Sequence, residues 1–330
     1  MTMEAPAALL PAPFTVSMMK SPGQTRNARS RSRCIVGLRP ATRASALPDL
    51  GADPIDHLLA LDPGGRGIGR FFQPGGARRA ADTLRRARRV LVTTGFVVDS
   101  GAAETDGPPG AAVLGRALRA LGAEVRYVTD AVTAPVLSAA LTALGEAADV
   151  IAWPDGDDAA RRLLASERPT HLVAIERPGR ARDGTYRNMR GADVSEWNAG
   201  IDELFVRAGR VTTVGVGDGG NEIGMGNVRA RLAKGGGLAA RIASVVSVDH
   251  LVVAGVSNWG AYGIVAHLGR LAGRPLLHTP DDERRLVTAC VAAGACDGVT
   301  RRREPTVDGL ALDTHAALVT LLGVAAKARA

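Results

Sequence analysis

The chain has 330 residues, of which 46% are hydrophobic and only 3% are aromatic, so we expect one large or two ordinary domains with a core of Ala, Val and Leu. The formal charge of +8 comes largely from residues 1–48, which hold seven Lys or Arg and one acid. The remainder is nearly neutral and gives no reason to expect a nucleic-acid partner. No run of 18 apolar residues occurs, so we expect no membrane span or membrane partner.

Residues 1–48 are rich in Pro, Ser, Arg and Ala and show no sustained periodicity. This composition predicts a disordered basic tail. It is also typical of an organelle targeting segment, and a start codon placed too far upstream would give the same pattern. If residues 1–48 are a transit peptide, we expect the protein in the matrix of the mitochondrion or of another organelle. Otherwise we expect a cytoplasmic protein.

Strands and helices alternate from about residue 50 onward. A β-branched run at 89–98 predicts a buried strand, and a helix follows over 106–122, with Pro108 and Pro109 in its first turn. Further strands are predicted at 124–130, 149–155, 170–176, 211–216 and 250–256. Further helices are predicted near 134–145, 157–166, 199–208, 260–271, 281–294 and 312–325. Thr279, Pro280 and Asp282 form a capping-box pattern before one of them.

This alternation predicts an α/β fold for residues 49–330, in one domain. The sheet should be mostly parallel and covered by helices on both faces, which gives three layers. In such a sheet, ligands bind outside the carboxyl ends of the strands. Polar residues follow four of the predicted strands, namely Glu104, Thr105 and Asp106; Glu176, Arg177 and Asn188; Asp218, Asn221 and Glu222; and Ser257 and Asn258. Together they predict a small-molecule site at this edge.

A glycine-rich loop follows the strand at 211–216, and six of the twelve residues from Gly215 to Gly226 are glycine. Gly215, Gly217 and Gly220 formally fit a dinucleotide fingerprint, but Asp218 lies inside the loop and the expected acid about 20 residues later is missing. A tight turn needs fewer glycines. We therefore expect the backbone to lie close to a small ligand, with amides that hold an oxyanion and acids that handle protons or a metal.

Four segments now stand together in order between about residues 55 and 325: ETDGPPGAAVLGRALRALG, AIERPGRARDGTYRNMRG, VGVGDGGNEIGMGNV and GVSNWGAYGI. They resemble the D-glutamate cyclase family, which includes an animal mitochondrial enzyme and stand-alone bacterial proteins. The resemblance implies a lyase that converts D-glutamate to 5-oxo-D-proline with loss of water. In this reaction the α-amine attacks the γ-carboxylate of the same molecule, so the enzyme mainly has to fold its substrate correctly.

For this chemistry we predict Asp218 and Glu222 as the catalytic acid and base, because a carboxylate pair with separated pKa values can do both jobs. The predicted substrate contacts are Gly217, Gly219, Gly220, Asn221, Glu104, Thr105, Asp106, Arg177, Asn188 and Asn258. The Arg177 fork suits a substrate carboxylate but could equally pair with Glu176 or Asp183.

Several alternatives stay open. Thr105 and Asp106 could serve only as the N-cap of the helix at Pro108, and Asn188 and Asn258 could serve only to hold loops. The sequence establishes no cofactor with certainty, and a divalent metal such as Mn²⁺ on Asp218 or Glu222 is compatible with the residues. Two other functions remain: a nucleotide-dependent enzyme that uses Gly215–Gly220 for phosphate, and a non-catalytic amino-acid-binding protein. The sequence does not indicate an oligomeric state.

Overall fold

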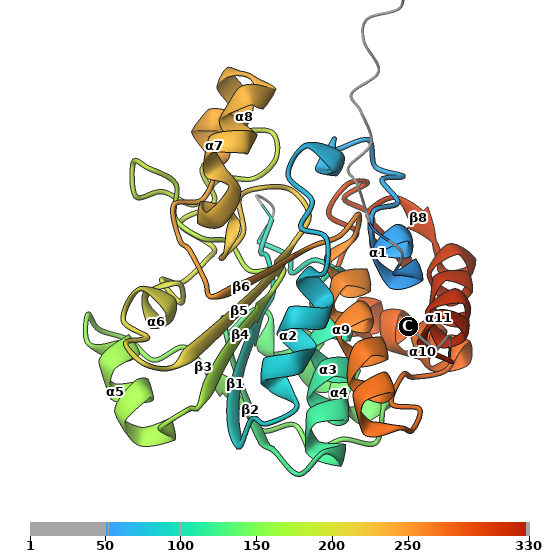
Figure 1. The fold of residues 1–330 in the computed structure, drawn as a ribbon. Helices are drawn as coiled ribbons and strands as arrows, with labels where there is room; N and C mark the ends of the chain where they lie inside the picture. Colours follow the sequence, from blue (N-terminus) through green and yellow to red (C-terminus); the bar gives the residue numbers. More distant parts are fainter. Residues whose placement is uncertain (1–50, 52, 99–100, 328–330) are drawn as a thin grey trace, which may run out of the picture. The chain divides into compact units, whose positions relative to one another are not determined.

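Six parallel strands form the main sheet, in the order β3-β2-β1-β4-β5-β6 (Figure 1). The computed structural model describes residues 51, 53–98 and 101–327, so the predicted tail at 1–48 lies outside the described residues. The strands are β1 Arg89–Thr94, β2 Glu124–Thr129, β3 Val150–Ala152, β4 His171–Ile175, β5 Thr212–Gly217 and β6 His250–Val253. A separate antiparallel pair consists of β7 Thr306–Val307 and β8 Leu310–Ala311.

Helices cover both faces of this sheet, which confirms the predicted three-layer α/β fold (Figure 1). One face carries α2 Gly76–Leu84, α3 Pro108–Ala120, α4 Ala134–Ala143 and α9 Ser257–Ala272, with α1 Pro54–Leu59, α10 Pro280–Ala292 and α11 Leu312–Lys327 packed outside them. The other face carries α5 Ala159–Glu167 and α6 Glu203–Val206. The short helices are η1 Ile68–Arg70, η2 Met225–Val228, α7 Arg229–Leu232, η3 Ala233–Gly235 and α8 Gly237–Ile242. Within the described residues, every helix is too short or too polar to cross a membrane.

The predicted elements of the sheet occur, with shifted ends. The strand predicted at 89–98 stops at Thr94, because Gly95 has a φ of +99° and leaves extended geometry. The helix predicted near 199–208 shrinks to the four residues of α6. The capping box is confirmed: the Asp282 amide donates to the Thr279 hydroxyl at 3.1 Å, and the Thr279 amide donates to the Asp282 carboxylate at 2.9 Å.

The strand order places a topological switch point between β1 and β4. From β1 the chain builds outward through β2 and β3, then returns to β4 on the other side of β1. The connections that leave β1 and β4 therefore diverge, which opens a crevice at the carboxyl ends of these two strands, where ligands bind in doubly wound sheets. The loops that follow β5 and β6 begin at the same carboxyl edge of the sheet.

Candidate functional site

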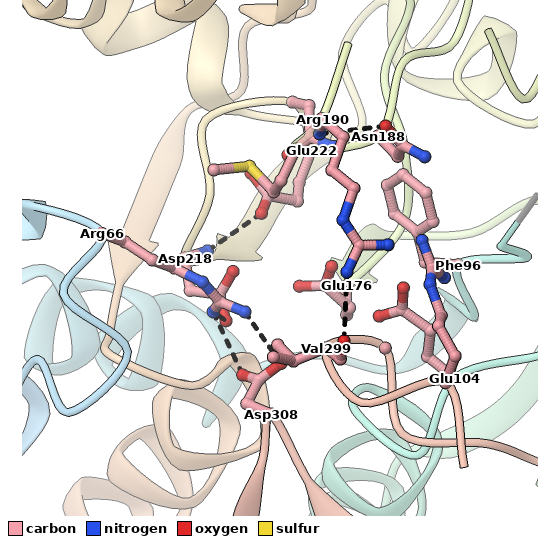
Figure 2. A pocket seen from close by; sticks show the side chains of 14 residues that line it. Arg66, Phe96, Glu104, Glu176, Asn188, Arg190, Asp218, Glu222, Val299 and Asp308 are labelled. Carbon is pink, nitrogen blue, oxygen red and sulfur yellow. Dashed lines mark hydrogen bonds and ion pairs between the residues drawn. The ribbon is translucent and has the colours of Figure 1, made fainter. Parts of the chain in front are cut away.

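Five carboxyl groups converge on a cavity at this carboxyl edge (Figure 2). Its volume is about 240 Å³, below the roughly 300–1,000 Å³ of pockets that take drug-sized ligands. The lining residues are Arg66, Phe96, Glu104, Glu176, Asn188, Met189, Arg190, Asp218, Asn221, Glu222, Gly298, Val299, Arg301 and Asp308. The cavity thus suits a small, charged molecule.

The carboxylate of Glu222 is held by the glycine loop itself. The backbone N–H groups of Asp218 and Gly219 donate to its Oε1 at 3.2 and 2.6 Å, and that of Gly220 donates to its Oε2 at 2.7 Å. Consecutive N–H groups aimed at one anion form the kind of nest that often binds phosphate. Here the anion is a side chain of the same loop, so these amides already have an acceptor.

The glycines allow the loop to close around this carboxylate. A Cβ on Gly217 would lie 2.9 Å from the Glu222 carboxylate, and a Cβ on Gly219 would lie 2.6 Å from the sulfur of Met189. Gly220 has a φ of +105°, which side chains with a Cβ rarely adopt. At Gly217 and Gly219 the missing side chain therefore leaves room for the Glu222 carboxylate beside the backbone.

Asp218 is buried and forms an ion pair with Arg66. The same guanidinium donates to both oxygens of Asp308, at 3.1 and 2.8 Å, so Arg66 bridges two carboxylates (Figure 2). Burial raises the pKa of Asp218 well above its usual range, and the charge of Arg66 opposes this shift. Asp218 is thus a stronger base than an exposed aspartate, and it stays next to a fixed positive charge.

Glu176 comes directly after β4 and has a φ of +43°, a backbone region that residues other than glycine seldom adopt. The hydroxyl of Ser257 donates to its Oε2 at 2.5 Å. Burial and the charge of Glu222 raise the pKa of Glu176 well above its usual range. Such backbone strain is concentrated at functional sites, and here it occurs where the chain turns from the strand into the cavity.

The helices α3 and α9 are capped reciprocally by Asp106 and Asn258. Asp106 accepts from the N–H groups of Ser257 and Asn258, at 2.9 and 2.8 Å, at the start of α9. The Oδ1 of Asn258 accepts from the N–H groups of Gly107 and Gly110, at 3.0 and 2.8 Å, at the start of α3. Each side chain thus satisfies donors that a helix start leaves unpaired, and the pair fixes both helices against the site.

Two carboxyl groups after β1 also favour their protonated form. Burial and the charges of Asp308 and Asp106 raise the pKa of Glu104 to about 8, while Arg301 lowers it. Burial and Asp308 raise the pKa of Asp106 too, against the amides at the start of α9. Near neutral pH Glu104 and Asp106 are therefore acids that can donate protons.

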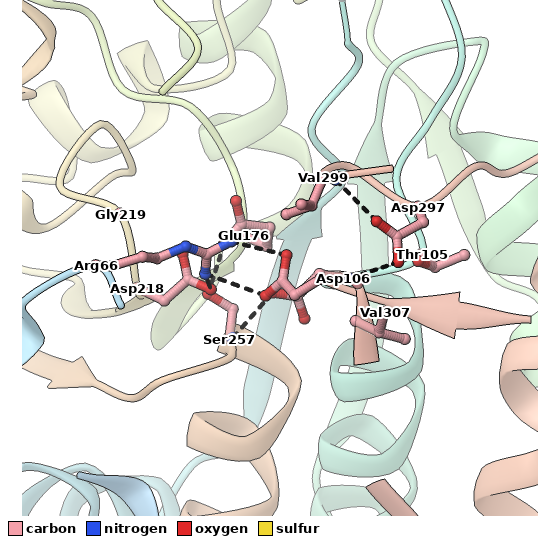
Figure 3. Close-up of polar contacts among 12 residues, drawn as sticks. Arg66, Thr105, Asp106, Glu176, Asp218, Gly219, Ser257, Asp297, Val299 and Val307 are labelled. Carbon is pink, nitrogen blue, oxygen red and sulfur yellow. Dashed lines mark hydrogen bonds and ion pairs between the residues drawn. The ribbon is translucent and has the colours of Figure 1, made fainter. Parts of the chain in front are cut away.

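Three of these acids form a candidate cation site. Asp106, Glu176 and Asp218 each contribute one carboxylate oxygen, and these oxygens lie within 4.8 Å of one another (Figure 3). Oxygen donors of this kind suit Mg²⁺ or Mn²⁺. Of the two metal ligands predicted from the sequence, Asp218 belongs to this group, whereas the carboxylate of Glu222 is held by amides.

A family model described as D-glutamate cyclase-like, C-terminal, matches residues 55–323. The chain belongs to the D-glutamate cyclase-like family. It is 38% identical over 239 residues to the human protein named D-glutamate cyclase, mitochondrial, a match that covers 65% of this chain and 38% of the human protein. The solved structure of an exopolyphosphatase-related protein from Bacteroides fragilis is similar over 76% of this chain and 57% of its own, with 6% identity and a TM-score of 0.40. The structure of exonuclease RecJ bound to manganese is similar over 66% of this chain and 43% of its own, with 12% identity and a TM-score of 0.34.

In this D-glutamate cyclase-like chain, the predicted site residues do not all reach the cavity. Those that line it are Glu104, Asn188, Asp218, Asn221 and Glu222. Gly217, Gly219 and Gly220 lie in the loop that holds Glu222, and Asp106 and Asn258 lie at the helix starts. Thr105 is fully buried and its hydroxyl donates to the Thr306 carbonyl at 2.7 Å. The α3 N-cap position belongs to Gly107, so neither Thr105 nor Asp106 is that N-cap residue.

Arg177 lies outside the cavity. Its fully buried guanidinium pairs with Asp130, with a second contact at 3.0 Å, and donates to two backbone carbonyls at 3.1 and 2.7 Å. The sequence suggested Glu176 or Asp183 as possible protein partners. Asp183 pairs with Arg187 instead, and Asp130 was not considered because it follows a different strand.

Sequence reasoning assigned no role to Arg66, Asp308, Arg190 or Arg301. Arg66, Arg301 and Asp308 lie away from the ends of the main strands, in loops and in the turn between β7 and β8, so the strand-end rule does not reach them. Arg190 lies in the long loop after β4, two residues from Asn188, and the folding of that loop brings it to the cavity. Glu176 was noted after its strand but received no role. Its position directly after a buried strand could have identified it as a site residue, because ligands bind at the carboxyl ends of such strands.

Proposed function

We propose that this protein is a D-glutamate cyclase that converts D-glutamate to 5-oxo-D-proline and water. Membership of the family and the name of the human relative support this reaction. The observation that carries the proposal is the group of buried carboxyl groups with raised pKa values around a cavity of about 240 Å³. Ring closure needs both a base and an acid, and this group supplies both.

The reaction forms a bond between the α-nitrogen and the carbon of the γ-carboxylate, Cδ, and breaks one carbon–oxygen bond of that carboxylate. The α-ammonium must lose one proton before it can attack and a second proton after the bond has formed, and the departing oxygen must gain two protons to leave as water. In our proposal the ionised form of Asp218 accepts the proton of the ammonium, because burial makes it a stronger base than an exposed aspartate and the ion pair with Arg66 holds its carboxylate in place. Glu176 or Glu104, which favour their protonated forms, donates to the departing oxygen.

Glu222 then has a positioning role rather than the proton-transfer role predicted from the sequence. Its oxygens are held by three amides, which fixes the loop that carries Asp218. Because the amides of Gly219 and Gly220 donate to Glu222, we do not assign them the oxyanion contacts predicted from the sequence. Asn188 and Asn221 remain the amide side chains at the cavity that can contact the substrate.

A divalent cation such as Mn²⁺ on Asp106, Glu176 and Asp218 fits the donor chemistry of the site. When bound, it would supply Lewis-acid polarisation of the substrate carboxyl. Each proton transfer described above uses side chains of the chain itself.

The nucleotide-dependent alternative has less support. A phosphate loop needs open amides, and in this loop they surround Glu222. The amino-acid-binding alternative differs from a cyclase only in turnover. The test is incubation of the purified protein with each glutamate enantiomer, with and without Mn²⁺, followed by chiral detection of 5-oxoproline. We expect product from D-glutamate and much less from L-glutamate. Equal rates, or binding without product under either condition, would overturn the proposal.

A further inference from the structure

Arg190 and Arg66 both line the cavity, but the guanidinium of Arg190 has fewer polar partners than that of Arg66. Arg66 is shared between two carboxylates. Arg190 makes one side-chain hydrogen bond, from Nη2 to the backbone carbonyl of Val299 at 3.1 Å. Within the described part of the chain, it has no carboxylate partner within ion-pair distance. A guanidinium whose single partner is a neutral carbonyl can exchange that partner for a carboxylate at little cost, because charge-assisted bonds are the stronger ones.

The backbone below Arg190 is fixed, although its side chain is exposed. The Oδ1 of Asn188 accepts from the N–H groups of Arg190 and Ala192, both at 3.0 Å. Figure 2 shows the Arg190 side chain running across the cavity from this turn toward Val299. The residue therefore presents a movable cation from a rigid support, which limits the entropy lost when it binds an anion.

Binding of D-glutamate in this cavity requires a positively charged side chain that can pair with a substrate carboxylate. D-Glutamate carries two carboxylates, and the cavity wall carries five carboxyl groups. The reacting γ-carboxyl and the amine have to lie among the buried acids that exchange protons with them. The α-carboxylate does not react, and inside the cavity it would lose its hydration without compensation unless a positive charge faced it.

We infer that Arg190 binds the α-carboxylate of the substrate, in exchange for the Val299 carbonyl, and so selects amino acids with a free α-carboxylate. This assignment rests on the proposed cyclase function and takes the place of the contact predicted for Arg177. The planar fork of Arg190 can hold both carboxylate oxygens, which a lysine ammonium does less well. The α-carboxamide analogue of D-glutamate, which lacks this charge, should gain little from Arg190.

The test compares Arg190→Gln and Arg190→Lys with Arg182→Gln, a matched control in the same loop that is exposed and does not line the cavity. Loss of a charged hydrogen-bond partner should raise KM for D-glutamate on the order of 10- to 100-fold in Arg190→Gln. We expect kcat to change much less, Arg190→Lys to be intermediate, and the control to match the wild type. For the α-carboxamide analogue, KM should be similar in all four proteins.

Calorimetric binding of D-glutamate and of 5-oxo-D-proline, which keeps the same carboxylate, provides a readout without turnover. Weaker binding in Arg190→Gln than in wild type supports the inference even if the wild type forms no product, a result that would remove the cyclase proposal alone. Wild-type KM and affinity in Arg190→Gln, with an active wild-type enzyme, would overturn the inference alone. If the wild type binds neither compound, both proposals fail.

Discussion

Asp218 and Glu222 are four residues apart in one loop, yet their carboxylates have different surroundings. The carboxylate of Asp218 forms an ion pair with Arg66, whereas among the described contacts the carboxylate of Glu222 accepts only from backbone N–H groups of its own loop. A carboxylate accepts at both oxygens, but an amide side chain accepts at one and donates at the other. Removing the charge should therefore have different consequences at the two positions.

Glu222→Gln should mainly lower stability, because its NH₂ group would meet an N–H donor of the loop. A buried donor left without an acceptor costs about 1–3 kcal/mol, which calorimetric unfolding would detect as a lower Tm. Asp218→Asn should unfold near the wild-type Tm and lose roughly 10²–10⁴-fold in kcat, the usual cost of losing an acid or base. A Glu222→Gln protein with wild-type Tm, or an Asp218→Asn protein with wild-type kcat, would contradict these assignments.

At the scale of elements, the site depends on how α3 and α9 begin. Pro108 and Pro109 occupy the first turn of α3 and have no N–H group, so the N–H of Gly110 is the first in the helix that needs an acceptor. Asn258, from the first turn of α9, supplies it at 2.8 Å. In return, α9 receives Asp106 as its acceptor. One pair of side chains thus positions two helices and one acid of the site.

Asn258→Ala should therefore reduce both stability and turnover. Loss of a capping acceptor costs up to about 2 kcal/mol, and the N–H groups of Gly107 and Gly110 would lose their acceptor, which loosens the start of α3 next to Asp106. Thr279→Ala is the matched control: it removes the cap of α10 far from the cavity and should cost about 1 kcal/mol with unchanged kcat. Chemical denaturation and steady-state rates would check both variants. Unchanged turnover in Asn258→Ala would show that the caps do not position the site.

The sequence predicts those parts of the site that depend on regular elements. The alternation of strands and helices predicts the parallel sheet, and the strand-end rule then brings Glu104 and Asp218 to one edge. The rule fails for Arg66 and Asp308, whose position depends on how irregular segments pack. It also gives no partner for Arg177, because a pairing with Asp130 requires the spatial order of β1, β2 and β4. Local spacing could not reveal that the loop amides bind Glu222.

For the whole molecule, the buried acids link folding to proton uptake. The pKa of Glu104 is about 8 in the folded protein, compared with about 4.3 for an unperturbed glutamate, and burial raises the pKa values of Glu176 and Asp218 as well. Between about pH 4.3 and 8 the folded state holds a proton on Glu104 that the unfolded state has released, so the contribution of this group to stability falls as the pH rises and levels off above about 8. The raised pKa values of Glu176 and Asp218 change stability in the same direction. His171 and His267 have lowered pKa values, which gives the opposite slope only below about pH 6.5.

Metal-free protein in EDTA should therefore lose Tm steadily from about pH 6.5 to 8, and Glu104→Gln should flatten part of this slope. If Mn²⁺ binds Asp106, Glu176 and Asp218, it competes with the protons on these groups. It should then raise Tm more at pH 8 than at pH 6.5, because fewer protons have to be displaced at the higher pH. Scanning calorimetry across this range, with and without Mn²⁺, makes the comparison. A flat Tm in EDTA would show that the acids are ionised in the folded state, and an equal Mn²⁺ effect at both pH values would indicate a binding site elsewhere on the chain.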